Sequence, residues 1–175
     1  KTARRGEGWT VGTATAFTPV AGLPTTAAAL EVYNNSNSRV MVISSLYAYQ
    51  LLSTAATQTY AIWAMVTTLK AIPTLTALSL FSLSGRNIVT PTAAGEIVTG
   101  VGTTVVANGW RPWGGVQAWG TAAALPGNAW SAELYGRITV PPGASLCVTV
   151  AGTVATASSF HCGFTFNWET MTVEA

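Results

Sequence analysis

Apolar and polar side chains alternate along several short stretches of this chain, which is the pattern of strands with one buried and one solvated face. The clearest run covers residues 130–140, where apolar or small side chains stand at the even positions. It ends at Pro141-Pro142-Gly143, which cannot continue a hydrogen-bonded ladder and favours a turn. Residues 160–169 repeat the pattern with Phe, Cys, Phe, Phe and Trp on one face. Both runs predict strands with a core-facing side, and the second places His161 on its polar face.

Further runs raise the predicted number of strands to about eight, and helical periodicity is hard to find. Residues 39–50 and 60–66 are apolar on both faces, which indicates strands covered on both sides. The other predicted strands cover residues 29–33, 75–83, 96–106 and 145–151. Many short strands separated by Gly, Pro and Asn are typical of a β-sandwich or barrel. We expect an all-β chain that forms a single jelly-roll β-sandwich of about eight antiparallel strands.

One domain accounts for the chain, because no internal repeat and no linker divides its 175 residues. A domain of this size buries roughly 70% of the surface that its unfolded chain exposes, so it needs no disulfide or metal to stabilise its core. We assign residues 1–27 to an N-terminal arm and lead-in segment, and residues 28–175 to the jelly-roll domain. The first residue is Lys rather than Met, so we expect a processed form or an incomplete N-terminus.

Charged residues are scarce. Lys and Arg number 8, Glu accounts for all 6 acidic residues, and the net charge is +2. The charged fraction of 8% compares with roughly 25% in ordinary soluble domains. Because a lone subunit needs charge for solubility, we expect other subunits to cover much of the surface, in a homo-oligomer with a trimer favoured. The predicted interface residues are Val40, Val42, Tyr47, Tyr49, Trp63, Met65, Trp110, Arg111, Trp113 and Trp119.

A membrane is the other way to cover an uncharged surface. Residues 40–69 contain no charge, but Ser, Thr and Gln interrupt them so often that no apolar run of about 20 residues exists. An eight-stranded outer-membrane barrel fits the length, although such barrels normally carry many more charges. We therefore expect no membrane partner.

The Trp-rich segment, residues 108–130, holds four of the seven tryptophans together with several glycines and Arg111. Indole faces beside a guanidinium are suited to stacking on sugars or bases, which makes a surface glycan one candidate partner. The alternative is that the indoles pin a long Gly-rich loop to the sheet or bury it at a subunit boundary. We favour this structural role because the segment offers three amides and no acid to fix sugar hydroxyls.

Residues suited to catalysis or metal binding are few. Cys147, His161 and Cys162 lack the fourth ligand and the paired spacing of a tetrahedral zinc site. His161 could join a serine and Glu169 in a triad, but the chain has no GxSxG motif and no Asp. The scattered glutamates do not favour a glycosidase pair. We expect no enzyme activity, no metal and no cofactor.

The two cysteines have two readings. A hairpin symmetric about residues 154–155 would bring Cys147 opposite Cys162 and allow a disulfide. That register would place the apolar side chains of the two strands on opposite faces, whereas a shift of one residue unites them and separates the sulfurs. We expect two buried free thiols, since Cys commonly packs as a small apolar residue.

Lys1, Arg4 and Arg5 place three of the eight cations in the first five residues. Such an arm is a candidate for contact with nucleic acid or with an acidic neighbour, and a solvated flexible terminus is the favoured alternative. We expect no nucleic-acid contact beyond this arm.

Three sequence segments, LEVYNN at 30–35, RVMVI at 39–43 and VPPG at 140–143, precede the aromatic final strand. Together they resemble the small jelly-roll structural proteins of bacterial viruses, which include capsid decoration, head-fibre and vertex proteins and are often trimeric. The resemblance covers roughly residues 28–169 and brings no functional residues with it. It implies a virion component that forms a homotrimer and contacts a major capsid protein or its own copies.

We therefore predict a non-enzymatic structural subunit of a viral particle, located at the capsid surface. We favour a role in decorating or reinforcing the capsid over a role in forming the shell itself. One alternative is a subunit of an extracellular filament or surface layer, linked by strand exchange through residues 1–22. Another is a lectin-like carbohydrate-binding module that uses the Trp-rich segment.

Overall fold

The computed structural model describes residues 8–25, 28–52, 58–68, 80–83, 97–100, 109–119, 129–152 and 158–170. Within these ranges the chain forms strands and no helix. The strands are β1 (Gly8–Gly12), β2 (Val20–Ala21), β3 (Leu30–Asn34), β4 (Arg39–Leu52), β5 (Gln58–Thr68), β6 (Phe81–Ser82), β7 (Ile97–Gly100), β8 (Arg111–Trp119), β9 (Ala129–Val140), β10 (Ala144–Gly152) and β11 (Ser159–Thr170).

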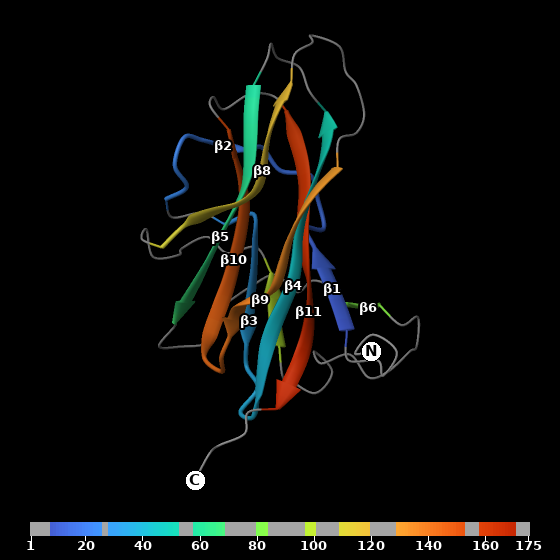
Figure 1. The fold of residues 1–175 in the computed structure, drawn as a ribbon, viewed down its shortest axis with the longest axis vertical. Helices are drawn as coiled ribbons and strands as arrows, with labels where there is room; N and C mark the ends of the chain where they lie inside the picture. The colour runs from blue at the N-terminus through green and yellow to red at the C-terminus, as the bar shows by residue number, and fades with distance from the viewer. Residues whose placement is uncertain are drawn as a thin grey trace.

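The strands form two sheets that pack face to face as a β-sandwich (Figure 1). The five-stranded sheet has the order β6-β1-β11-β4-β9. The six-stranded sheet has the order β7-β3-β10-β5-β8, and the short β2 pairs with β10 in parallel. The prediction of an all-β sandwich is thus confirmed.

The eight strands of five or more residues pair in a nested order, all antiparallel. The first pairs with the last (β1 with β11), and the second with the seventh (β3 with β10). The third pairs with the sixth (β4 with β9), and the fourth with the fifth (β5 with β8). Two further antiparallel pairs, β11 with β4 and β10 with β5, join these into the two sheets. The chain is therefore a long antiparallel ribbon wound around one core.

The aromatic face of β11 forms the centre of that core, as the alternation predicts. Phe160, Phe164 and Phe166 are fully buried, and the rings of Phe164 and Phe166 lie 5.8 Å apart. Trp130 of β9 contacts Phe160 edge-on, with ring centroids 5.8 Å apart. Full burial of side chains of this size contributes about 1.5–3 kcal/mol each. The two runs with the clearest alternation, β9 and β11, thus lie in one sheet and supply much of its inner face.

Three strands lie where the sequence predicted none. β1 and β2 fall within residues 1–27, the segment assigned to an N-terminal arm and lead-in. β1 pairs with β11 and β6 of the same chain and buries Trp9 and Val11, so residues 8–12 are part of the five-stranded sheet. Their alternation is too short to stand out in the sequence. β8 falls in the predicted Gly-rich loop, and its register against β5 shifts at Gly114-Gly115, where small residues permit the bulge.

Part of the prediction lies outside the described residues. Of the predicted strands at 75–83 and 96–106, the structure describes the pieces that form β6 and β7. Lys1, Arg4 and Arg5 also lie outside the described ranges.

A buried asparagine closes one end of the sandwich. Asn34 donates through Nδ2 to the carbonyls of Arg39 and Val140, each at 2.9 Å, and its Oδ1 accepts from the Ser36 amide at 2.9 Å. The Gly143 amide donates to the Asn34 carbonyl at 2.9 Å. One side chain thus ties the β3–β4 turn to the β9–β10 turn, the two turns that the sequence predicts in this region.

Candidate functional site

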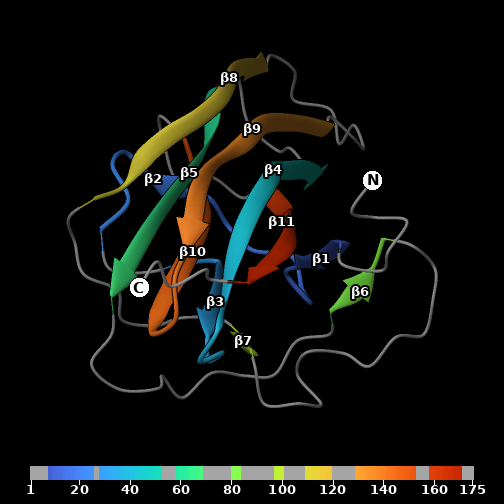
Figure 2. The same ribbon diagram turned by 60° about the horizontal axis from the view of Figure 1, so that its bottom comes forward.

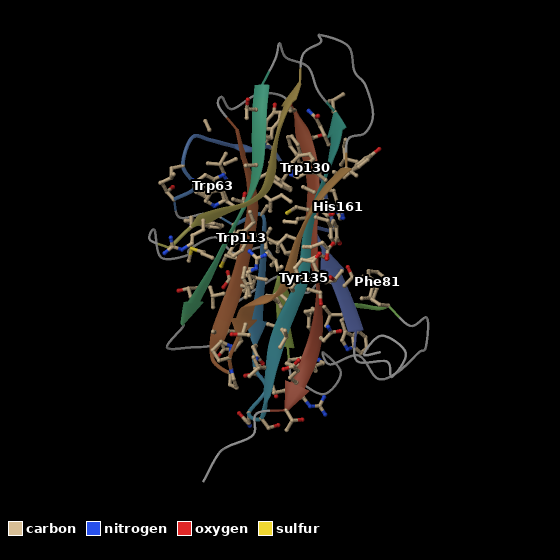
Figure 3. The ribbon with its side chains drawn as sticks, viewed as in Figure 1. Trp63, Phe81, Trp113, Trp130, Tyr135 and His161 are labelled. Carbon is tan, nitrogen blue, oxygen red and sulfur yellow. The ribbon has the colours of Figure 1, made fainter. Side chains whose placement is uncertain are left out.

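A pocket opens on the outer face of the five-stranded sheet. Its cavity of about 380 Å³ crosses β1, β11 and β4, and Phe81 of β6 stands at its rim (Figure 3). Phe81 pairs with Thr10 across the β1–β6 ladder, so both side chains belong to the same face. The lining residues are Thr10, Val11, Gly12, Thr13, Ala14, Tyr47, Phe81 and His161.

Two glycines let the aromatic rings of the pocket lie close to the sheet. A Cβ at Gly12 would lie 2.8 Å from the Tyr47 hydroxyl and 2.8 Å from Nε2 of His161. A Cβ at Gly163 would clash with the Tyr47 ring and with the backbone oxygen of Val11. Glycine at these adjacent positions of β1 and β11 is therefore a requirement of the pocket's geometry.

Hydrogen bonds hold the polar groups of the pocket in place. The Tyr47 hydroxyl donates to the Val11 carbonyl at 3.2 Å and lies 3.4 Å from the Thr10 hydroxyl. Burial raises the pKa of Tyr47 above its ordinary value, so this group stays a neutral phenol. The ring of Tyr47 lies 6.0 Å from that of His161, tilted by 36°.

His161 is fixed through its Nδ1, which lies 2.9 Å from the Thr13 hydroxyl oxygen. That oxygen also accepts from the Cys162 amide at 3.4 Å. The other ring nitrogen, Nε2, lies over Gly12. The described lining residues include no Glu, Lys or Arg, so the polar groups that they present suit neutral polar partners.

A second feature lies on β9, at the edge of the same sheet. Residues 134–137 of β9 stand opposite the single residue Ser44, which makes a bulge. Tyr135 is 80% exposed there with φ of 48°, and Gly136 follows with φ of 78°. A left-handed conformation costs a residue other than glycine about 1–2 kcal/mol. The bulge therefore holds a large aromatic side chain in solvent at a cost in backbone strain.

The predicted interface residues fall into three groups. Val40, Val42, Tyr47 and Tyr49 point outward from β4 and are half-buried in the single chain, where coverage by a neighbouring subunit stays a prediction. Arg111 is exposed at the start of β8, whereas Met65 and Trp110 are buried in the chain itself. Trp63 and Trp113 are partly buried against the chain's own clusters, and the side chain of Trp119 lies outside the described residues.

The chain itself covers part of the outer face of the six-stranded sheet. The outer cluster consists of Ala28, Met65, Trp110 and Cys147, with Trp63 packed against it. Nε1 of Trp110 donates to the Thr25 carbonyl at 2.9 Å, so this indole pins the lead-in segment to the sheet. Its burial leaves little of the ring for stacking on a sugar or on a neighbouring subunit.

Both cysteines are buried free thiols, as expected, but the hairpin on which the register argument was based does not form. Cys162 lies in the core on β11 and Cys147 lies in the outer cluster on β10, so they belong to different sheets. Burial raises the pKa of both thiols, and the nearby Glu31 raises that of Cys147 further. Such thiols are poor nucleophiles and poor metal ligands.

His161 was predicted on the polar face of its strand, but its neighbours Thr10, Thr13 and Phe81 were not predicted to lie beside it. They come together through the β1–β11 and β1–β6 ladders, for which the sequence offered no signal beyond a short Thr and Gly alternation.

Across the described ranges, no three His, Cys, Asp or Glu side chains gather in a way that could hold a metal ion. The same ranges contain no helix of the length and hydropathy needed to cross a membrane. Comparisons of the chain with protein-family models, with curated proteins and with solved structures gave no match.

Proposed function

We propose that this protein is a non-enzymatic structural subunit of a viral particle, which assembles as a homotrimer at the capsid surface and contacts the major capsid protein. The nested order of strand pairing is the observation that carries the proposal. Pairing of the first strand with the last, the second with the seventh, the third with the sixth and the fourth with the fifth supports a jelly roll. The jelly roll is a fold that serves as a viral capsid module. The resemblance to decoration, head-fibre and vertex proteins supports the same role.

The surface supports self-association. Large apolar side chains are exposed at several places on a chain whose charged fraction is 8%. Such a surface favours contact with other subunits over contact with water. The exposed apolar residues among those described are Leu23, Leu51, Leu52, Val66, Phe81, Leu83 and Tyr135.

The subunit contact that we propose lies on the lateral side of the sandwich where both sheets end in long strands. There the sheets end in β8 and β9, strands of 9 and 12 residues that lie side by side (Figure 2). A long edge strand offers a row of unpaired backbone groups to a neighbour. We place the contact on the β8–β9 side, with Tyr135 as its aromatic anchor.

Light scattering on the purified chain tests the assembly. We expect a closed oligomer of three chain masses, and Tyr135→Ala should shift it toward the monomer. Leu23→Ala is the matched control, because it removes an exposed apolar side chain far from β9 in the chain and should leave the mass unchanged. A wild-type protein that stays monomeric as its concentration rises would refute the proposal.

The virion location is tested separately. Antibody raised against the purified chain and coupled to gold should label the surface of particles of the virus whose genome encodes the chain. Label on filaments or on a cell surface layer would instead favour the extracellular alternative.

A further inference from the structure

The pocket on the outer face of the five-stranded sheet is built in advance of any ligand. Thr10 donates to the Phe164 carbonyl at 3.3 Å, Tyr47 donates to the Val11 carbonyl, and His161 is tied to Thr13. Because each polar side chain is anchored to β1 or β11, little side-chain freedom remains to be lost on binding. Preorganisation of this kind is typical of ligand sites and exceeds what a solvated sheet face needs.

The hydrogen-bonding capacity of the pocket is only partly used. Nε2 of His161 lies over Gly12 and has no hydrogen-bond partner among the described residues. The Tyr47 hydroxyl donates its proton to the backbone, and its oxygen can still accept a hydrogen bond. Two polar atoms with unused capacity therefore lie together over Gly12. A hydroxyl group both donates and accepts, so it matches them in either tautomer of the histidine.

The wall of the pocket is aromatic. Phe81 is 63% exposed beside these polar groups, so the face of its ring is available for contact with a ligand. Among the described residues that line the cavity none is charged, so these side chains offer no group that would neutralise an anion or a cation. A ligand with one apolar face and one hydroxyl edge, without charge, fits these features. A cavity of about 380 Å³ lies in the size range of small-molecule sites.

We propose that this pocket binds a neutral saccharide, with one sugar ring against Phe81 and its hydroxyls on Tyr47 and Nε2 of His161. The site differs from the Trp-rich segment, whose Trp110 and Trp130 are buried. It adds a recognition role to the proposed structural subunit and does not depend on the oligomeric state.

An array of neutral mono- and oligosaccharides, with sialylated and sulfated glycans as the anionic arm, tests this site. Wild type should bind neutral glycans, and the free sugar of the best hit should compete. Phe81→Ala and His161→Phe should each weaken binding by about tenfold or more, the first by losing the stacking face and the second by losing Nε2 while keeping a ring. Leu83→Ala is the matched control, because it removes an exposed apolar side chain two residues from Phe81 and should bind as wild type.

The single histidine provides a second readout that does not depend on folding of a variant. The ring signals of His161 can be assigned without ambiguity, and titration with the best sugar should shift them. Absence of any neutral hit, unshifted His161 signals, or a preference for anionic glycans would overturn the proposal. Loss of the oligomer in Phe81→Ala would also overturn it, because the pocket would then be a subunit contact. A wild-type monomer that binds sugar would refute the assembly and leave the sugar site standing.

Discussion

The two outer faces of the sandwich are built differently. On the six-stranded sheet every residue of β10 is buried, and Trp110, Met65 and Cys147 form an outer cluster over it. On the five-stranded sheet the outward side chains of β4 and β11 are mostly half-buried, and a polar pocket lies among them. Among the described residues, the chain thus covers one face with its own side chains and leaves the other more exposed, so the scarcity of charge has two different explanations in one molecule.

The largest expected effect is a difference between the two outer faces in how much a substitution lowers the free energy of unfolding. Trp110→Ala removes the indole at the centre of the outer cluster and its bond to Thr25, and should lower the free energy of unfolding by about 3–5 kcal/mol. Tyr49→Ala on the open face should cost much less, since its side chain is half-buried. Urea denaturation of both variants measures the difference, and equal losses would show that the two faces are covered alike.

The next effect concerns the glycines under Tyr47. Gly163→Ala places a methyl group against the backbone oxygen of Val11 and should cost about 1–3 kcal/mol, because backbone in a paired strand cannot move aside. Gly12→Ala meets the tips of Tyr47 and His161, which can rotate, so it should cost less while abolishing sugar binding. Thermal unfolding with the same glycan titration distinguishes the two. A harmless Gly163→Ala would contradict the close packing of Tyr47 on β11.

A smaller effect with the opposite sign is expected at the β9 bulge. Tyr135→Gly relieves the left-handed backbone and should stabilise the fold by about 1 kcal/mol, while it removes the anchor and weakens the oligomer. Denaturation and light scattering on the same sample measure both quantities. A variant that loses stability, or that keeps the oligomer intact, would refute the role given to this residue.

The smallest effect is pH-dependent and lies on the covered face. Burial raises the pKa of the Glu31 carboxyl above its ordinary value of 4.5, against the opposing effect of Ser145. Folding therefore favours the protonated acid, and this contribution is fully present below pH 4.5 and lost as pH rises through the folded pKa. Glu31→Gln should match wild type in stability at about pH 4 and exceed it at about pH 7. Denaturation curves at both pH values test this, and a constant difference would contradict the raised pKa.

The sequence predicted the fold best where alternation is long. β9 and β11 are each 12 residues long and alternate almost regularly between apolar and polar side chains, so this alternation alone identifies the face that is buried. β1 has only Trp9 and Val11 to mark it, and β8 has glycines in the middle that are typical of loops. Short or glycine-containing strands depend on pairing with strands that are distant in sequence, and the local pattern carries no information about those partners.

The pocket could not be predicted for a related reason. The sequence predicts His161 as a single histidine on the polar face of a strand. Its place in a pocket depends on Thr13 and Phe81, which lie near it because strands distant in sequence pair with one another. The requirement for glycine at residues 12 and 163 is equally invisible until Tyr47 is seen to lie over them.

The measurement that bears most directly on the account is the solution mass of the purified chain across a range of concentrations, with and without salt. An open face, two long edge strands and few charges predict a closed oligomer of three chain masses that persists in salt, because its contacts are mainly apolar. A monomer at every concentration would contradict the claim that these surfaces serve assembly, and a mass that grows without limit would replace the closed trimer with a filament.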